Sequence, residues 1–146
     1  MLDRDGTLNR ERADYVKSWE EFEWLPGALD ALRQFAVLET PIVLVTNQSA
    51  IGRGIITDAG FDLLQQQMLE EITQAGGRID ATFVCPHTPD AGCDCRKPKP
   101  GLLEQAARTF GVDLRHSIFV GDAATDLRAA QAVSCHCILV RTGRQG

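Results

Sequence analysis

The apolar residues of this chain follow two patterns, continuous runs and stretches with helical spacing. The run at 42–45 is apolar at every position, and the shorter or interrupted runs at 81–84, 117–120 and 135–140 are mostly apolar. Runs of this kind, rich in β-branched residues, are typical of strands covered on both faces. Between them, apolar residues recur every three or four positions over 29–36, 61–72 and 102–110, which predicts helices. Alternating strands and helices predict a three-layer, Rossmann-like α/β/α fold with a central parallel sheet.

Composition limits the kind of protein this is. With 146 residues, of which 44% are hydrophobic, the chain can form one domain over 1–146 with a core that needs no disulfides. The formal charge of −5 argues against a nucleic-acid partner, since such proteins carry an excess of Lys and Arg. No apolar run approaches the roughly 20 residues that span a bilayer, and no secretory leader is evident. We therefore expect a cytoplasmic monomer with no membrane partner.

Two carboxylates lie two residues apart near the start of the chain, at Asp3 and Asp5, and Gly6 and Thr7 follow. One carboxylate can act as a nucleophile and the other can move a proton, while glycine permits a tight turn and the hydroxyl can hold an anion. A solvated turn would show the same pattern, so its interpretation depends on the rest of the chain. Because so few residues precede Asp3, we expect the numbered sequence to begin inside its first strand.

Polar residues also follow two later predicted strands. Thr46 and Asn47 come after the run at 42–45, and Asp122 comes after the run at 117–120. In open α/β sheets, ligands bind at the carboxyl ends of the strands. Asp126, four residues after Asp122, is either a charge at the start of a helix or a further ligand.

The loop over residues 85–95 carries a metal-ligand pattern. Cys85 and His87 are followed, after five residues, by Cys93 and Cys95. Three thiolates and an imidazole complete a tetrahedral zinc site, and since all four positions come from the protein, the ion would be structural. The alternative is a set of buried or free thiols.

Together these residues predict Mg²⁺-assisted phosphoryl transfer. Asp3 would attack phosphorus and form an aspartyl-phosphate, while Asp5 would protonate the leaving alkoxide and later deprotonate water. Mg²⁺ would be held by Asp3, by the backbone carbonyl of Asp5 and by Asp122. Arg96 and Lys97, fixed by the metal loop before them, would offset the charge of the phosphate.

The same residues resemble the motifs of the haloacid dehalogenase (HAD) superfamily of phosphatases, in order and over nearly the whole chain. The matching stretches are Asp3 to Thr7, Thr46 with Asn47, Lys97, and Gly121 to Asp126. The resemblance implies a HAD fold and, given the short chain, no cap domain. Ala123 stands where this superfamily often has a lysine, which would leave Lys97 as the main amine of the site.

Within that superfamily, several stretches are similar to the D,D-heptose 1,7-bisphosphate phosphatases. They are residues 2–9, 46–49, 53–54, 85–98 and 139–143. This similarity implies hydrolysis of the 7-phosphate of D-glycero-D-manno-heptose 1,7-bisphosphate, a small phosphorylated metabolite of lipopolysaccharide heptose synthesis. It also implies phosphate or substrate contacts at Thr46, Asn47, Arg53, Arg96 and Lys97.

Three alternatives remain open at this point. The histidinol-phosphate phosphatases of histidine biosynthesis share the zinc loop and the Arg-Lys-Pro that follows it, so these residues do not separate the two. A DNA 3′-phosphatase would use the same first motif but needs a basic groove. A non-catalytic zinc-binding interaction module would explain the cysteines and leave the aspartates without a role.

Overall fold

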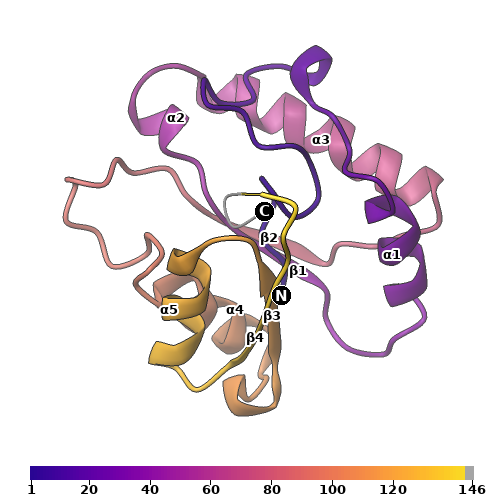
Figure 1. The fold of residues 1–146 in the computed structure, drawn as a ribbon, viewed down its shortest axis with the longest axis vertical. Coiled ribbons are helices and arrows are strands. Elements are labelled where there is room, and N and C mark those ends of the chain that lie inside the picture. Colours follow the sequence, from indigo (N-terminus) through magenta and orange to yellow (C-terminus); the bar gives the residue numbers. More distant parts are fainter. Residues whose placement is uncertain (144–146) are drawn as a thin grey trace.

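Parallel strands form the centre of the molecule and helices cover both of their faces (Figure 1). The computed structural model describes residues 1–143. The strands are β1 (Val43–Asn47), β2 (Ala81–Cys85), β3 (Ile118–Gly121) and β4 (His136–Leu139). The helices are α1 (Ala28–Phe35), α2 (Ser49–Gly52), α3 (Asp58–Gln74), α4 (Gly101–Phe110) and α5 (Ala124–Ala132), with short 3₁₀ turns η1 (Trp19–Glu21) and η2 (Leu114–His116). Strands thus form in each of the four apolar runs, and helices at the three predicted places.

The first residues of the chain join two strand pairs into one sheet. β1 pairs in parallel with β2, and β3 pairs in parallel with β4. Leu2 lies between the pairs and bridges both Leu44 and Val120. Its amide donates to the carbonyl of Val43, and the amide of Asp3 donates to the carbonyl of Val120, at 2.8 and 2.9 Å. The order is therefore β2, β1, residues 1–3, β3, β4, which places Asp3 at the centre of the carboxyl edge.

Alternate residues of β1 face two separate parts of the core, as the period of a strand requires. Val43 and Val45 pack with the buried residues of α4 and α5, whereas Leu44 packs with those of α1 and α3. Leu44 and Val45 are completely buried. The predicted three-layer arrangement is confirmed, and the described residues contain no inserted cap domain.

The segment between Arg10 and Trp24 has two faces. Trp19 stacks on Phe22 with ring centroids 4.8 Å apart, Phe22 meets Trp24 edge to face, and all three pack on the core beside α1 and α3. Other residues of this segment, Tyr15 among them, line the main cavity. The segment therefore covers the core and also forms one wall of the site. Within residues 1–143, no helix has both the length and the apolar character needed to cross a membrane.

Candidate active site

A cavity of about 200 Å³ opens at the carboxyl edge of the sheet. Residues that follow β1 and β3 line it, together with the turn after Asp3 and the end of the metal loop. The predicted site residues that line the cavity are Asp3, Asp5, Asn47, Arg96, Lys97 and Asp122. Residues up to 119 positions apart in the chain therefore converge on one small space, because the carboxyl ends of parallel strands meet there.

Lys97 is a buried cation of this site and contacts two carboxylates. Its Nζ lies 2.9 Å from Oδ1 of Asp3 and 2.7 Å from Oδ1 of Asp126, and it donates to the carbonyl of Val45 at 2.9 Å. Burial by itself lowers the pKa of Lys97, but the two carboxylates outweigh it and raise that pKa above its ordinary value. Burial raises the pKa of Asp3, and the Lys97 ammonium acts against it. The ammonium is therefore charged at neutral pH and lies against the predicted nucleophile.

Asn47 fixes the backbone that carries this lysine. Its side-chain amide donates to the carbonyl of Lys97 at 3.0 Å, and its side-chain oxygen accepts from the amide of Lys97 at 3.1 Å. These two bonds join the end of β1 to the segment after the metal loop. The polar atoms of Asn47 thus hold Lys97 in place as well as facing the cavity.

Three donors surround the carboxylate of Asp5. Arg4 Nη2 and Asn9 Nδ2 each donate to Oδ1 at 2.9 Å, and Gln48 Nε2 donates to Oδ2 at 2.8 Å. Burial alone would raise the pKa of Asp5, but Arg4 and the two amides outweigh it and hold the pKa below its ordinary value. Arg4 is itself only 1% exposed. No periodicity or spacing in the sequence identifies Arg4, Asn9 and Gln48 as donors to Asp5. The one hint is that Arg4 stands between two aspartates.

Asp3, Asp122 and Asp126 form an acidic group whose ligand atoms lie within 4.8 Å of one another. Asp126 is committed on both oxygens, since Oδ2 accepts from the amides of Asp122 and Ala123 at 3.0 and 3.1 Å and Oδ1 faces Lys97. Asp126 therefore caps the first turn of α5 and also anchors the lysine. Buried carboxylate oxygens gathered in this way fit a hard cation such as Mg²⁺.

Two glycines leave room for the carboxylate of Asp122. A Cβ at Gly6 would lie 2.3 Å from Asp122 Oδ2, and a Cβ at Gly143 would lie 2.0 Å from the same atom. Gly6 also has φ +84°, a backbone region that favours glycine. Thr142 ties the two loops together, because its hydroxyl donates to the carbonyl of Gly6 at 2.8 Å. No sequence pattern marks the part that these residues play in shaping the acidic group.

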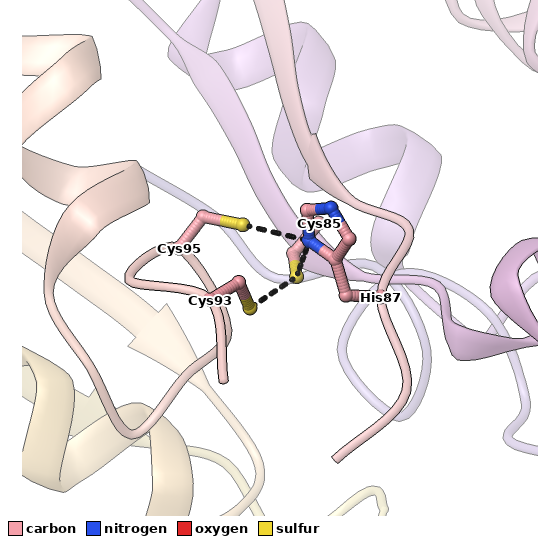
Figure 2. A group of neighbouring side chains, drawn as sticks. All are labelled: Cys85, His87, Cys93 and Cys95. Carbon is pink, nitrogen blue, oxygen red and sulfur yellow. Dashed lines mark hydrogen bonds between the residues drawn. The ribbon is translucent and has the colours of Figure 1, made fainter. Parts of the chain in front are cut away.

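The cysteine and histidine side chains of the metal loop point toward one another (Figure 2). His87 Nδ1 lies 3.3 Å from Cys95 Sγ and 3.5 Å from Cys85 Sγ, and the sulfurs of Cys85 and Cys93 are 3.7 Å apart. Three sulfurs and one ring nitrogen at such separations fit a tetrahedral zinc ion. Within residues 1–143, this group and the acidic group are the two clusters suited to a metal.

The remaining predicted contacts lie around this centre. Thr46 is 1% exposed and is not among the residues that line the cavity; its hydroxyl accepts from Gln48 Nε2 at 2.9 Å. Arg53 is exposed and also lies outside the lining. The pKa of the cavity residue Tyr15 is lowered chiefly by its hydrogen bond with the Ser49 hydroxyl and further by the nearby guanidinium of Arg53. Arg53 therefore lies at the rim of the cavity, whereas Thr46 is behind its wall.

The fold and this site together define a hydrolase of the HAD class. A family model of HAD-hydrolase-like proteins matches residues 94–146. A D-glycero-beta-D-manno-heptose-1,7-bisphosphate 7-phosphatase of Pseudomonas aeruginosa is 41% identical over 144 residues, which is 99% of this chain and 81% of the relative. The chain belongs to the family of D-glycero-beta-D-manno-heptose-1,7-bisphosphate 7-phosphatases.

Solved structures agree with this assignment. The crystal structure of the D,D-heptose 1,7-bisphosphate phosphatase from Bordetella bronchiseptica, complexed with magnesium and phosphate, superposes with a TM-score of 0.95 at 42% identity, covering 99% of this chain and 80% of that one. The D,D-heptose 1,7-bisphosphate phosphatase from Burkholderia thailandensis gives a TM-score of 0.72 at 32% identity, with 99% and 78% covered. The predicted superfamily and the predicted family are both confirmed.

Proposed function

We propose that this protein is a Mg²⁺-dependent phosphatase that removes the 7-phosphate of D-glycero-D-manno-heptose 1,7-bisphosphate. The observation that carries the proposal is the position of Asp3, at the centre of the sheet edge and in contact with Lys97. Relatives of about 40% identity that bear this enzyme's name support the choice of substrate. These relatives favour the heptose substrate over histidinol phosphate, and a phosphatase over DNA repair or a non-catalytic zinc module.

In the first half of the reaction, an oxygen of Asp3 attacks phosphorus while the bond from phosphorus to the sugar oxygen breaks. The step starts from the form of the site in which Asp5 carries a proton, a form that its three donors disfavour. Asp5 gives this proton to the sugar oxygen, and the phosphoryl group remains on Asp3. In the second half, Asp5 takes a proton from water, which attacks the same phosphorus and frees Asp3 and inorganic phosphate. Asp5 ends each cycle as it began. The donors on Asp5 stabilise the carboxylate that exists between the two steps.

Positive charge and donors around Asp3 would stabilise the transferring group. Lys97 supplies an ammonium in contact with Asp3, and Arg96 adds a guanidinium in the cavity wall. Arg53, which is near Tyr15 of the cavity wall, is proposed as a contact for the second phosphate of the substrate. Asn47 is proposed as a further phosphate contact at the end of β1. Thr46, expected from the sequence to share that role, lies behind the cavity wall with its hydroxyl bonded to Gln48.

The acidic group would hold Mg²⁺ through Asp3, Asp122 and the backbone carbonyl of Asp5. When bound, this ion supplies Lewis-acid stabilisation of phosphoryl oxygens. Because burial raises the pKa of Asp3, positive charge beside it favours the ionised form that acts as the nucleophile.

The cysteine and histidine cluster of residues 85–95 would hold a structural zinc ion. Cys95 is two residues from Lys97, so the loop sets the direction in which Arg96 and Lys97 leave it. Arg96 is tied back to the loop, since its Nη1 donates to the carbonyl of His87 at 3.3 Å. We further propose a single domain over 1–146 that acts as a cytoplasmic monomer on a small phosphorylated metabolite.

Phosphate release in the presence of Mg²⁺ tests the choice of substrate. The purified protein is compared on D-glycero-D-manno-heptose 1,7-bisphosphate and on histidinol phosphate, with Asp3→Asn as the matched inactive control. We expect a strong preference for the bisphosphate and no turnover by the variant on either compound. A preference for histidinol phosphate would assign the protein to histidine biosynthesis with the same chemistry. Release from neither would reject the proposed function.

A further inference from the structure

Gln48 is a buried polar residue of the cavity wall that the mechanism above uses only as one of three donors to the Asp5 carboxylate. It is 7% exposed and follows β1 directly, in the loop that leads into α2. Its side-chain amide has two protons and donates one to Asp5 Oδ2 at 2.8 Å and the other to Thr46 Oγ1 at 2.9 Å. Its backbone amide donates to the carbonyl of Cys85 at 2.8 Å. Gln48 is therefore fixed at both ends and meets the general acid and base of the proposed reaction.

The two oxygens of Asp5 are not held equally. Oδ1 accepts from both Arg4 and Asn9, whereas Gln48 is the donor to Oδ2. The side chain of Asp5 is 25% exposed, so space is available for it to rotate toward the cavity. Without the bond to Gln48, the carboxylate would be held through Oδ1 only. It could then rotate as far as the hydrogen bonds from Arg4 and Asn9 to that oxygen allow.

We propose that Gln48 is a positioning residue that aims the carboxyl group of Asp5 at the leaving oxygen and at the attacking water. The proposal rests on the proposed phosphatase reaction and adds the group that orients its proton carrier. Thr46 completes the arrangement, because its hydroxyl accepts from the amide and so fixes the amide's orientation. Proton transfer requires heavy atoms within hydrogen-bond reach of one another, and a displacement of about 1 Å can cost on the order of 100-fold in rate.

A comparison of two leaving groups separates this role from a merely structural one. A sugar alkoxide leaves only when it is protonated, so its departure depends on Asp5. Nitrophenolate is a stable anion and leaves p-nitrophenyl phosphate without that proton. The ratio kcat/KM reports steps up to transfer of the phosphoryl group to Asp3, whereas kcat also includes the hydrolysis of the aspartyl-phosphate, in which Asp5 acts as base.

The experiment compares wild type with Gln48→Met, which keeps the length of the side chain but has no donor, and with Gln48→Leu, which keeps most of its bulk and has no polar group. We expect kcat/KM for the sugar phosphate to fall about 10- to 100-fold in both variants, while kcat/KM for p-nitrophenyl phosphate changes little. We also expect a rapid burst of nitrophenol equal to the enzyme present, followed by slow turnover, since hydrolysis of the intermediate still needs Asp5.

Gln65→Met is the matched control. Gln65 Nε2 donates to Thr82 Oγ1 at 2.6 Å, so this change also removes a glutamine-to-threonine bond, but on α3 and outside the cavity lining. We expect it to lower Tm by about as much as Gln48→Met and to leave both kcat/KM values unchanged. Equal losses of kcat/KM on the two compounds in the Gln48 variants, or unchanged kinetics, would overturn the positioning role.

The choice of sugar does not affect this test. If wild type hydrolyses histidinol phosphate rather than the heptose compound, the proposed substrate fails, and the leaving-group comparison is made with histidinol phosphate, which also releases an alkoxide. If wild type and both Gln48 variants hydrolyse p-nitrophenyl phosphate with the same kinetics and the same burst, Gln48 has no positioning role. The phosphatase activity itself would still stand.

Discussion

Asp3, Asp122 and Asp126 form a group of three buried carboxylates, and the Lys97 ammonium contacts two of them. Replacing Lys97 by methionine would remove this ammonium. The side chain keeps its length, but Asp3 and Asp126 lose a partner at 2.9 and 2.7 Å, and the carbonyl of Val45 loses a donor. Both side chains of the pair between Lys97 and Asp126 are only 2% exposed, so water cannot replace the lost contact. Removing one partner of a buried ion pair typically costs about 3–5 kcal/mol.

For a chain of this size, a loss of about 3–5 kcal/mol in the free energy of unfolding corresponds to a fall in Tm of about 6–20 °C. Thermal unfolding followed by circular dichroism in the absence of Mg²⁺ measures it. Lys17→Met is the control, because Lys17 forms ion pairs with Asp14 and Glu21 in a partly exposed setting, and such pairs contribute little. We expect only a small change in its Tm.

Adding Mg²⁺ provides a second arm of the same experiment. A divalent cation that binds the folded state stabilises it, and in Lys97→Met it would also offset the mutual repulsion of Asp3, Asp122 and Asp126. We therefore expect Mg²⁺ to raise the Tm of the variant more than that of wild type. A variant with the Tm of wild type, or a variant that is insensitive to Mg²⁺, would refute the assignment of Lys97 as the counter-charge of this group.

Three further predictions follow from other parts of the structure. Cys93→Ser should lower both the zinc content, measured by atomic absorption, and Tm; unchanged values would show that the metal loop does not stabilise the fold. Gly143→Ala places a Cβ against Asp122, so the Mg²⁺ concentration needed for half-maximal activity should rise, and an unchanged value would contradict the proposed ligand. Arg115 lowers the pKa of Asp113 from 3.8 to about 2, so the stability contributed by Asp113 is present above pH 3.8 and is lost as the pH falls toward 2. The Tm difference between wild type and Asp113→Asn should accordingly shrink over that range, and a constant difference would contradict it.

Strands and helices could be predicted because their signals are local. The run from Ile42 to Val45 is apolar at every position, as a strand between two helical layers requires, and β1 forms there. Local signals also mark helix starts: threonine is a favoured helix cap, and the hydroxyl of Thr57, just before α3, accepts from the amide of Gly60. The carboxyl edge of the sheet then follows from topology, which is why Asp3, Lys97 and Asp122 could be expected to meet.

Side-chain partners were harder to predict, because they depend on contacts across the fold. Asp126 could be a helix-start charge or a ligand on spacing alone, and only the contact with Lys97 shows that it also anchors the ammonium. Arg4 and Gln48 belong to no periodic pattern, so nothing local marks them as donors to Asp5. The depth of Thr46 and the position of Arg53 at the rim likewise depend on how loops pack, which residue spacing does not encode.

The most direct test of the central claim is to follow both phosphates of D-glycero-D-manno-heptose 1,7-bisphosphate by ³¹P NMR in the presence of Mg²⁺. Wild type and Asp3→Asn are incubated with the compound under the same conditions. We expect that with wild type the 7-phosphate signal disappears, the signal of inorganic phosphate grows, and the 1-phosphate signal stays. With Asp3→Asn we expect no change in either phosphate signal. Loss of the 1-phosphate, or release of the 7-phosphate by Asp3→Asn, would contradict it.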